Sequence, residues 1–553
     1  MKVHIYKFFK TAALLVFLST IVLISSFAQG FSPQTISRLQ HVLDSFQNNS
    51  AIEFVGGMSA AIKVDSLAMW QGVAGYSARN VDGENNLLPG GTLFTTSTLS
   101  RIFSITKSFT APLVLELAKE GAFKLDDPVN KFVPLNLINP GLDGSVTIRQ
   151  LLAHESGYSD YETDEIQFQM AVAFQPTRIW TPYEIIYFVH QLAEHGTVRN
   201  YSSTNYILLG AIVEAVTGRP IEQFYRERFF TPLGLNSMYF AVREQQPAGT
   251  VLASPHENIS PFNPIFQFTG QPTFPDAYTN IFRFPYDGIA SAAFSGGAII
   301  SNAADVAEWG NSLFGARATS RDILDTMLTS IPSTPDEDGD YLGYGIWRSS
   351  RMSTTTTFLG HDGNAPGYRA IMYYQPERKM TIAVLTNFHG ADIYAIGRAL
   401  YAALPNFIGG NDNRKEPKII LCYNGHMQTV DRNAADVLIR KGAYLGGCDQ
   451  PGLTNTSSPI PESTLAMNRA SIRSFPNPAS GHFSVFYSVP KAVRINIALY
   501  SSDGKLMETL YNGWADKNLN RRLDVPTGAL PKGVYMCRIS TADGIFQQKV
   551  VIQ

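Results

Sequence analysis

Residues 103–120 of this chain read FSITKSFTAPLVLELAKE, with apolar residues at helical spacing. Ser104 and Lys107 stand at the start of this expected helix, three positions apart and on the same face. A serine hydroxyl is a weak nucleophile until a base removes its proton, and a lysine becomes such a base when burial lowers its pKa from about 10.4. The same spacing recurs at positions 488–491 and 502–505, so it is not specific by itself.

Beyond this helix, the region from about 31 to 408 has strand-like ends and a helical middle. The β-type patterns cover residues 58–64, 68–73, 369–374 and 380–386. The helical patterns cover residues 106–120, 183–194, 203–216, 303–313 and 391–404. We therefore predict an α+β domain in which the two ends pair as one antiparallel sheet covered by helices. A site is expected where the sheet and the helical part meet.

Two further segments bring polar side chains to the ends of expected elements. Tyr201, Ser202 and Ser203 precede an apolar helical pattern, which places a phenol and small hydroxyls at a helix start. The run GHDGNAPG at 360–367 leads into the strand pattern 368–374. Glycines beside a strand allow a substrate or a catalytic helix to approach the backbone closely.

Together these segments resemble the three motifs of the serine β-lactamase and penicillin-binding-protein superfamily. They are most similar to the branch of class C β-lactamases, D-alanyl-D-alanine carboxypeptidases and esterases, over about residues 40–405. The resemblance implies a β-lactamase/transpeptidase-like fold. It also implies a serine hydrolase that cleaves an ester, an amide or a D-amino-acid peptide through an acyl-enzyme, without a cofactor.

The resemblance implies a role for each matching residue. Ser104 would be acylated, Lys107 would help to deprotonate it, and Tyr201 would be a general base or proton shuttle. His361 would occupy the cationic corner that orients the substrate. Backbone amides of Ser104 and Asn364 would form the oxyanion hole. The residues expected to contact substrate are Ser203, Gly363 and Asn364.

Ser203 departs from the family pattern, which usually has asparagine at this position. Serine offers one hydroxyl in place of an amide donor and a carbonyl. The change disfavours β-lactams and peptidoglycan stems, whereas simple acyl hydrolysis is compatible with it. The alternative function is a catalytically silent binding module on the same fold, because a fold does not fix a function.

The composition excludes several other classes of protein. Lys+Arg 44 against Asp+Glu 46 gives a net charge of -2, so no nucleic-acid partner is expected. His154-Glu155 lacks the second histidine of a zinc helix, and His154 is expected to be structural. The aromatic-rich run 262–286 is expected to be a packed loop that also walls the acyl pocket.

The first 28 residues are expected to be a signal peptide. Three lysines precede an uncharged run over 11–27, which ends in Ser-Phe-Ala before Gln29. The alternative is an uncleaved anchor helix, since this run approaches the length of a membrane span. No later stretch is long and apolar enough to span a membrane, so we expect an exported chain whose hydrolase domain covers 29–408.

The last quarter of the chain contains its three cysteines. A linker and a small module over 409–449 hold Cys422 and Cys448, which we expect to form a disulfide in an exported chain. The alternative adds His426 to this pair as a metal site, but a fourth ligand is missing. Residues 450–470 have the composition of a flexible linker.

Residues 471–553 alternate at spacing two between turns, which predicts a small all-β sandwich. FPNPA at 475–479 and LPKGVY at 530–535 resemble the sorting domain of the type IX secretion system of Bacteroidetes. The resemblance implies export through the periplasm by that machinery, followed by release outside or attachment to the cell surface. The alternative is an ordinary adhesion-type sandwich.

Overall fold

The computed structural model describes residues 30–405, apart from 49–53, 66–68 and 337–338, together with the strands of the segment 419–552 and a few residues beside them. The chain divides between Lys415 and Glu416 into two compact units. The expected signal peptide, the 450–470 linker and Cys448 lie outside the described residues.

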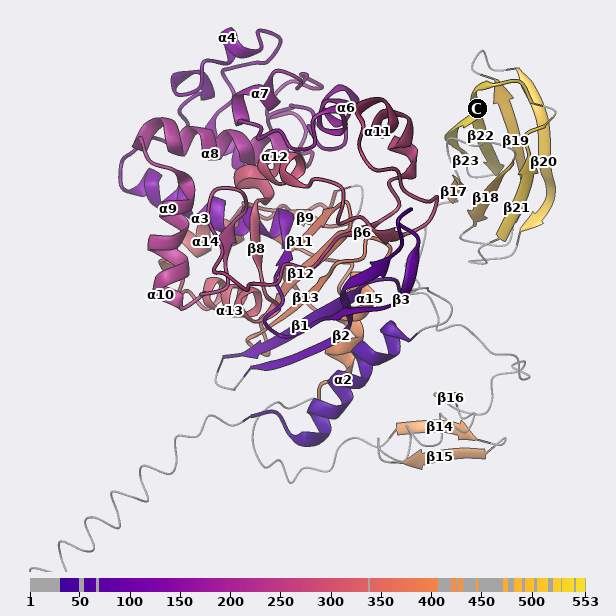
Figure 1. Ribbon diagram of the computed structural model, residues 1–553, viewed down its shortest axis with the longest axis horizontal. Coiled ribbons are helices and arrows are strands. Elements are labelled where there is room, and N and C mark those ends of the chain that lie inside the picture. The colour runs from indigo at the N-terminus through magenta and orange to yellow at the C-terminus, as the bar shows by residue number, and fades with distance from the viewer. Residues whose placement is uncertain are drawn as a thin grey trace, which may run out of the picture. The chain divides into compact units, whose positions relative to one another are not determined.

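The first unit is built on an eight-stranded sheet in which both ends of the region take part (Figure 1). Its order is β3 (Leu87–Leu93), β2 (Trp70–Val81), β1 (Gly57–Val64), β13 (Met380–Thr386), β12 (Tyr368–Gln375), β11 (Leu359–Ala365), β10 (Trp347–Arg348) and β9 (Tyr341–Leu342). β1 and β13 pair antiparallel, with Ala60 opposite Val384. The predicted antiparallel sheet between the two ends is therefore confirmed.

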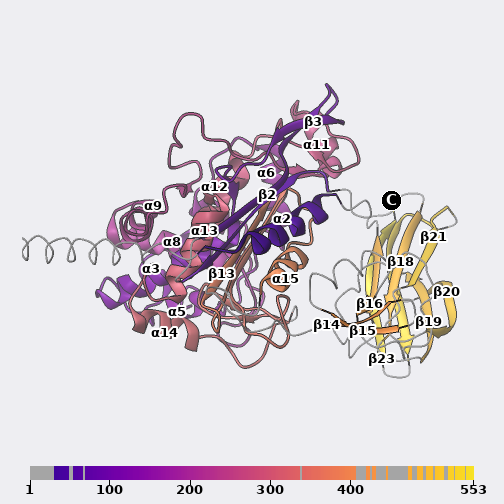
Figure 2. The ribbon, with the colours of Figure 1, turned by 90° about the horizontal axis from the view of Figure 1, so that it is seen from below.

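Helices cover both faces of this sheet. Every residue of β13 is buried, and its continuous apolar run MTIAVLT is typical of a strand with both faces covered. One face packs against α2 (Pro33–Gln47) and α15 (Ile393–Ala403), as Figure 2 shows. The other face packs against α13 (Ala303–Phe314), which joins it to the large helical core.

The remaining helices form the helical part between the two sets of strands. They are η1 (Phe103–Thr106), α3 (Lys107–Lys119), η2 (Val129–Lys131), α4 (Leu135–Ile138), α5 (Ile148–Leu152), α6 (Ile166–Phe174), α7 (Pro182–Ile186), α8 (Ser203–Thr217), α9 (Ile221–Tyr225), η3 (Arg226–Phe230), α10 (Thr231–Leu233), η4 (Ser260–Phe262), α11 (Asn263–Thr269), α12 (Asp287–Gly297) and α14 (Arg321–Thr329). Two small sheets accompany them: β4 (Ser100–Arg101), β8 (Ile299–Ser301) and β5 (Tyr239–Phe240) in one, and β6 (His256–Glu257) and β7 (Thr279–Asn280) in the other.

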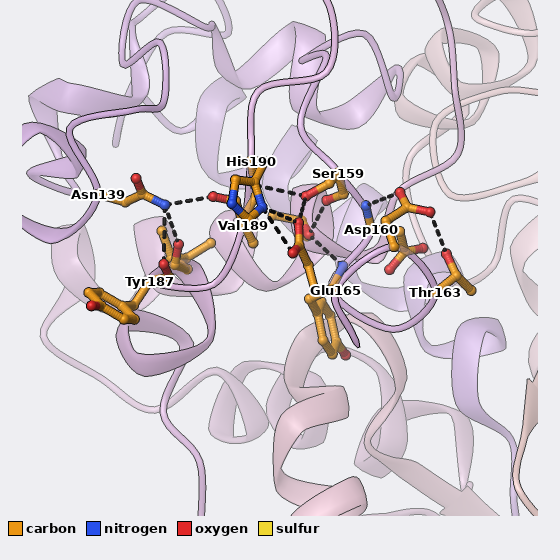
Figure 3. A network of polar contacts seen from close by, with 12 residues as sticks. Asn139, Ser159, Asp160, Thr163, Glu165, Tyr187, Val189 and His190 are labelled. Atoms are coloured by element: carbon orange, nitrogen blue, oxygen red, sulfur yellow. Dashed lines mark hydrogen bonds and ion pairs between the residues drawn. The ribbon is translucent and has the colours of Figure 1, made fainter. Parts of the chain in front are cut away.

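The prediction of one helix over 183–194 was wrong, because α7 ends at Ile186. Asn139 Nδ2 donates to the carbonyl oxygens of Ile186 at 3.0 Å and Val189 at 2.6 Å, and so binds backbone groups that a longer helix would use itself (Figure 3). The backbone N–H of His190 donates to Ser159 Oγ at 2.9 Å. Contacts with distant residues therefore end this helix.

The aromatic run 262–286 packs around a satellite core, as expected of a packed loop. This core includes Ile259, Phe266, Phe274, Ile281 and Phe284. Of the aromatic residues in this run, Tyr286 packs against Phe103, beside Ser104. Phe268 points away, with 83% of its surface exposed.

The second unit contains two sheets that share one core. Their orders are β17 (Ser471–Phe475), β18 (His482–Ser488) and β21 (Arg521–Pro526), and β20 (Leu506–Ala515), β19 (Val493–Ser501), β22 (Gly533–Thr541) and β23 (Gly544–Ile552). Alternating residues Tyr535, Cys537 and Ile539 of β22 are buried in this core with Val485 of β18. The predicted all-β C-terminal region is confirmed. A third sheet joins β15 (His426–Val430), β14 (Ile419–Tyr423) and β16 (Tyr444–Leu445).

Candidate active site

Ser104 lies in η1, at the turn between β4 and α3. The preceding residue, Phe103, has a φ of 41°, a backbone conformation that side chains other than glycine rarely adopt. Ser104 remains partly accessible, while its neighbours Phe103, Ile105 and Lys107 are buried. A strained turn thus presents one hydroxyl from an otherwise buried segment.

Lys107 is fully buried and lies against Ser104, as their spacing in η1 and α3 predicts. Its Nζ donates to Ser104 Oγ at 2.9 Å, to Ser203 Oγ at 3.2 Å and to the carbonyl oxygen of Gly296 at 2.9 Å. Burial lowers the pKa of Lys107 to about 8, although the negative charge of Glu162 partly opposes that shift. About a tenth of the amine is therefore neutral at pH 7.

Tyr201 contacts the other side of the same hydroxyl. Its phenolic O–H donates to Ser104 Oγ at 2.7 Å. Burial raises the pKa of Tyr201 well above its usual value, and the nearby charge of Glu162 adds to the rise. The phenol is thus protonated at neutral pH and acts as a hydrogen-bond donor to Ser104.

His154 supports the segment that carries Tyr201. Its buried ring lies between the rings of Tyr201 and Tyr206, with centroid distances of 4.7 and 5.0 Å. Its Nδ1 accepts a hydrogen bond from the backbone N–H of Ser202 at 3.1 Å, just before α8. This position fits the structural role expected for His154.

His361 is fully buried on β11, so the motif that was expected to lead into a strand is itself a strand. Its Nδ1–H donates to the carbonyl oxygen of Asp362 at 2.6 Å. Its ring lies 4.2 Å from that of Trp347 and 6.1 Å from that of Tyr201, centroid to centroid. Burial, and then the charge of Lys107, lower the pKa of His361 well below its usual value. This lowered pKa favours the neutral imidazole, and the substrate-orienting role expected for His361 stays a prediction.

Gly363 brings β11 against the segment before Ser104. A Cβ at this position would lie 2.1 Å from the carbonyl oxygen of Ile102, so only glycine permits this approach. Because Asn364 follows directly, its backbone lies beside η1. The structure thus gathers the hydroxyl, the amine, the phenol and the imidazole from η1, α3, the segment just before α8, and β11.

Two carboxylates that sequence reasoning missed also face this cluster. Asp160 Oδ2 accepts a hydrogen bond from the backbone N–H of Ser203 at 3.0 Å. Glu162 Oε2 accepts one from Ser203 Oγ at 3.2 Å. Burial, followed by the charge of Glu162, raises the pKa of Asp160 to about 7. The only sequence signal for these residues is their place directly after the segment LLAHESGY.

The predicted disulfide stays a prediction. Cys422 lies on β14, opposite Met427 and Tyr444, and Cys448 is outside the described residues. Within the described residues, no helix has the length and apolar character needed to cross a membrane.

Comparisons with known proteins match both units. A family model described as Beta-lactamase matches residues 55–404, and one described as Secretion system C-terminal sorting domain matches residues 473–553. Penicillin-binding protein 4 of Amycolatopsis lactamdurans is 33% identical over 171 residues, which are 28% of this chain and 42% of that protein. This chain thus matches less than half of that relative.

Two further comparisons extend over more of the first unit. A putative D-alanyl-D-alanine carboxypeptidase of Escherichia coli (strain K12) is 26% identical over 312 residues, which are 53% of this chain and 70% of that protein. The crystal structure of D-amino acid amidase from Ochrobactrum anthropi SV3 has the same fold, with a TM-score of 0.54 and 24% identity over 67% of this chain and 98% of that one. The C-terminal match indicates export to the cell surface or secretion. With 350 of its 553 residues inside the matched range, the chain belongs to the beta-lactamase family of serine hydrolases and carries a C-terminal secretion sorting domain.

Proposed function

We propose that this protein is an exported hydrolase of the class C β-lactamase-like branch, which forms an acyl-enzyme on Ser104 and cleaves an ester, an amide or a D-amino-acid peptide. One observation carries the proposal: Ser104 Oγ is held at 2.9 Å by Lys107 Nζ and at 2.7 Å by the hydroxyl of Tyr201. A base and an acid thus contact the same oxygen, which is what covalent catalysis requires.

Acylation begins when neutral Lys107 takes the proton of Ser104. The freed oxygen attacks the carbonyl carbon of the substrate and forms the new C–O bond. Backbone amides of Ser104 and Asn364 stabilise the negative charge that develops on the carbonyl oxygen. The protonated phenol of Tyr201 gives its proton to the leaving group as the old bond breaks, and the ammonium of Lys107 then reprotonates Tyr201.

Deacylation uses the same groups with water in place of the leaving group. Lys107 takes a proton from a water molecule while the oxygen of that water attacks the acyl carbon. The bond between the acyl carbon and Ser104 Oγ then breaks. The proton returns to Ser104, so the enzyme is unchanged. The ring of His361 packs against Trp347, which packs against Tyr201, so His361 supports Tyr201 through these contacts. Its burial disfavours a positive charge on the ring.

The silent-module alternative is less consistent with this arrangement. A site that had lost its chemistry would have no reason to bury a lysine, since desolvation of its charged form is unfavourable. Here Lys107 is 0% exposed and directed at Ser104. The family motif is also kept at every position except the asparagine that Ser203 replaces.

Covalent labelling tests the proposal. A fluorophosphonate probe is expected to modify the wild-type protein on the tryptic peptide 102–107, and Ser104→Ala is expected to abolish the labelling. Ser502→Ala is the matched control, because Ser502 also precedes a lysine by three positions. Hydrolysis of p-nitrophenyl esters that persists in Ser104→Ala would overturn the proposal.

A further inference from the structure

Glu162 differs from the other polar groups of the cluster because it is exposed. Its Oε2 accepts a hydrogen bond from the buried Ser203 Oγ, and its Oε1 accepts one from Tyr161 O–H at 2.9 Å. Ser203 Oγ in turn accepts a hydrogen bond from Lys107 Nζ. A solvent-exposed carboxylate is thus linked to the catalytic lysine through one hydroxyl, that of Ser203.

The loop that carries Glu162 is held in place on both sides. The backbone N–H of Glu162 donates to Asp160 Oδ1 at 3.0 Å, and the carbonyl oxygen of Glu162 accepts a hydrogen bond from Gln169 Nε2 at 2.8 Å. Figure 3 shows the polar network of the flanking residues, in which buried Glu165 accepts a hydrogen bond from Ser159 Oγ and contacts His190 Nδ1 at 2.9 Å. These contacts fix the loop, so Glu162 is a positioned group and not a freely moving surface side chain.

The charges around Ser104 favour a cation from the substrate. Across the described part of the chain, no lysine or arginine forms an ion pair with Glu162. Lys107 is linked to Glu162 only through Ser203 Oγ, and it must be neutral to act as a base. The Nδ1–H of His361 donates to the carbonyl oxygen of Asp362, and its buried Nε2 has no hydrogen-bond partner among the described residues. His361 shares one face of β11 with Gly363, which packs against η1, so this vacant acceptor belongs to the Ser104 side of the strand.

We propose that Glu162 binds a protonated amine on the acyl part of the substrate, so that this enzyme prefers aminoacyl esters, amides and peptides with a free amine to their N-acylated counterparts. The proposal rests on acylation of Ser104 as described above. Three hydrogen bonds of 3.2, 3.2 and 2.9 Å lead from the Glu162 carboxylate through Ser203 and Lys107 to Ser104 Oγ. An α-amine lies only two bonds from the scissile carbonyl carbon, so it is the cation that an aminoacyl substrate would bring to this side of Ser104.

Matched substrates test this preference directly. The full chain is assayed with alanine p-nitroanilide and phenylalanine p-nitroanilide, both enantiomers, each compared with its N-acetyl derivative, and with neutral p-nitrophenyl butyrate. The wild type is expected to have a higher kcat/KM for the free amines. Glu162→Gln keeps the shape and removes the charge, and should lower kcat/KM for the free amines by roughly tenfold to a hundredfold, the range of a charge-assisted hydrogen bond. At pH 7 the N-acetyl substrates and the butyrate should lose no activity, because Glu162→Gln lowers the pKa of Lys107 and so increases its neutral fraction.

Glu377→Gln is the control, because Glu377 is an exposed glutamate in the turn between β12 and β13 and should leave every substrate unchanged. Equal losses of free-amine and N-acetyl activity in Glu162→Gln would overturn the proposal, since they would mean a structural role. A wild type that shows no preference for the free amine would also overturn it. Butyrate hydrolysis that depends on Ser104 separates these results from a failure of the proposed acylation, in which no substrate would be turned over through Ser104.

Discussion

The pH dependence of ester hydrolysis reports the ionisation of the base. Lys107 is active only when neutral, and its pKa of about 8 means that about one molecule in a hundred is competent at pH 6, a tenth at pH 7 and nine tenths at pH 9. For p-nitrophenyl butyrate, kcat/KM is therefore expected to rise tenfold per pH unit up to pH 7, then to level off, with a total gain of roughly ninetyfold between pH 6 and 9. Nitrophenol release is followed at its isosbestic wavelength so that product ionisation does not distort the profile.

A charge variant makes this prediction sharper. The negative charge of Glu162 raises the pKa of Lys107, so Glu162→Gln should move the midpoint of the profile below that of the wild type. Glu377→Gln should leave the midpoint in place. A flat profile, a midpoint near the usual lysine value of about 10.4, or a midpoint that rises in Glu162→Gln would refute the assignment of Lys107 as the base.

Three further variants test other parts of the site. Tyr201→Phe removes the donor to Ser104 Oγ, and should lower kcat by roughly a hundredfold to a thousandfold with little change in KM, as steady-state kinetics would show. Gly363→Ala places a Cβ 2.1 Å from the carbonyl oxygen of Ile102, and should reduce the free energy of unfolding by about 1–3 kcal/mol together with activity; an unchanged urea midpoint would contradict the packing described. The folded pKa of Lys107 lies below its unfolded value, so keeping its charge buried destabilises the protein at pH values below about 8, an effect relieved as the pH rises toward 10.5. Lys107→Met should therefore be inactive yet no less stable than the wild type at pH 6, and a lower Tm there would count against this reasoning.

Much of the fold could be predicted from the sequence, because the features that determine it are local spacings or clear hydrophobic patterns. The strand 380–386 is a continuous apolar run, and it is buried on both faces. Ser104 and Lys107 are three positions apart, so one helical turn suffices to bring them together. The prediction of one helix over 183–194 was wrong for the opposite reason. The hydrogen bonds that end this helix come from Asn139, which lies some fifty residues earlier in the chain.

The electrostatics of the site could not be obtained from the sequence. Whether His361 is charged depends on its burial beside Trp347 and Lys107, which are distant in the chain. Glu162 and Asp160 stand in a polar segment that resembles any surface loop, and only their contacts with Ser203 show that they face the site. Residue types can thus indicate a site, whereas their charge states require the packing around them.

The most direct test of the central claim is the mass of the enzyme during turnover. The protein is mixed with a p-nitrophenyl ester, quenched with acid within the first turnovers and digested with trypsin. The account predicts a burst of about one nitrophenol per enzyme and an acyl group on Ser104 in peptide 102–107. Steady hydrolysis with no acylated peptide, or an acyl group on any other residue, would contradict it.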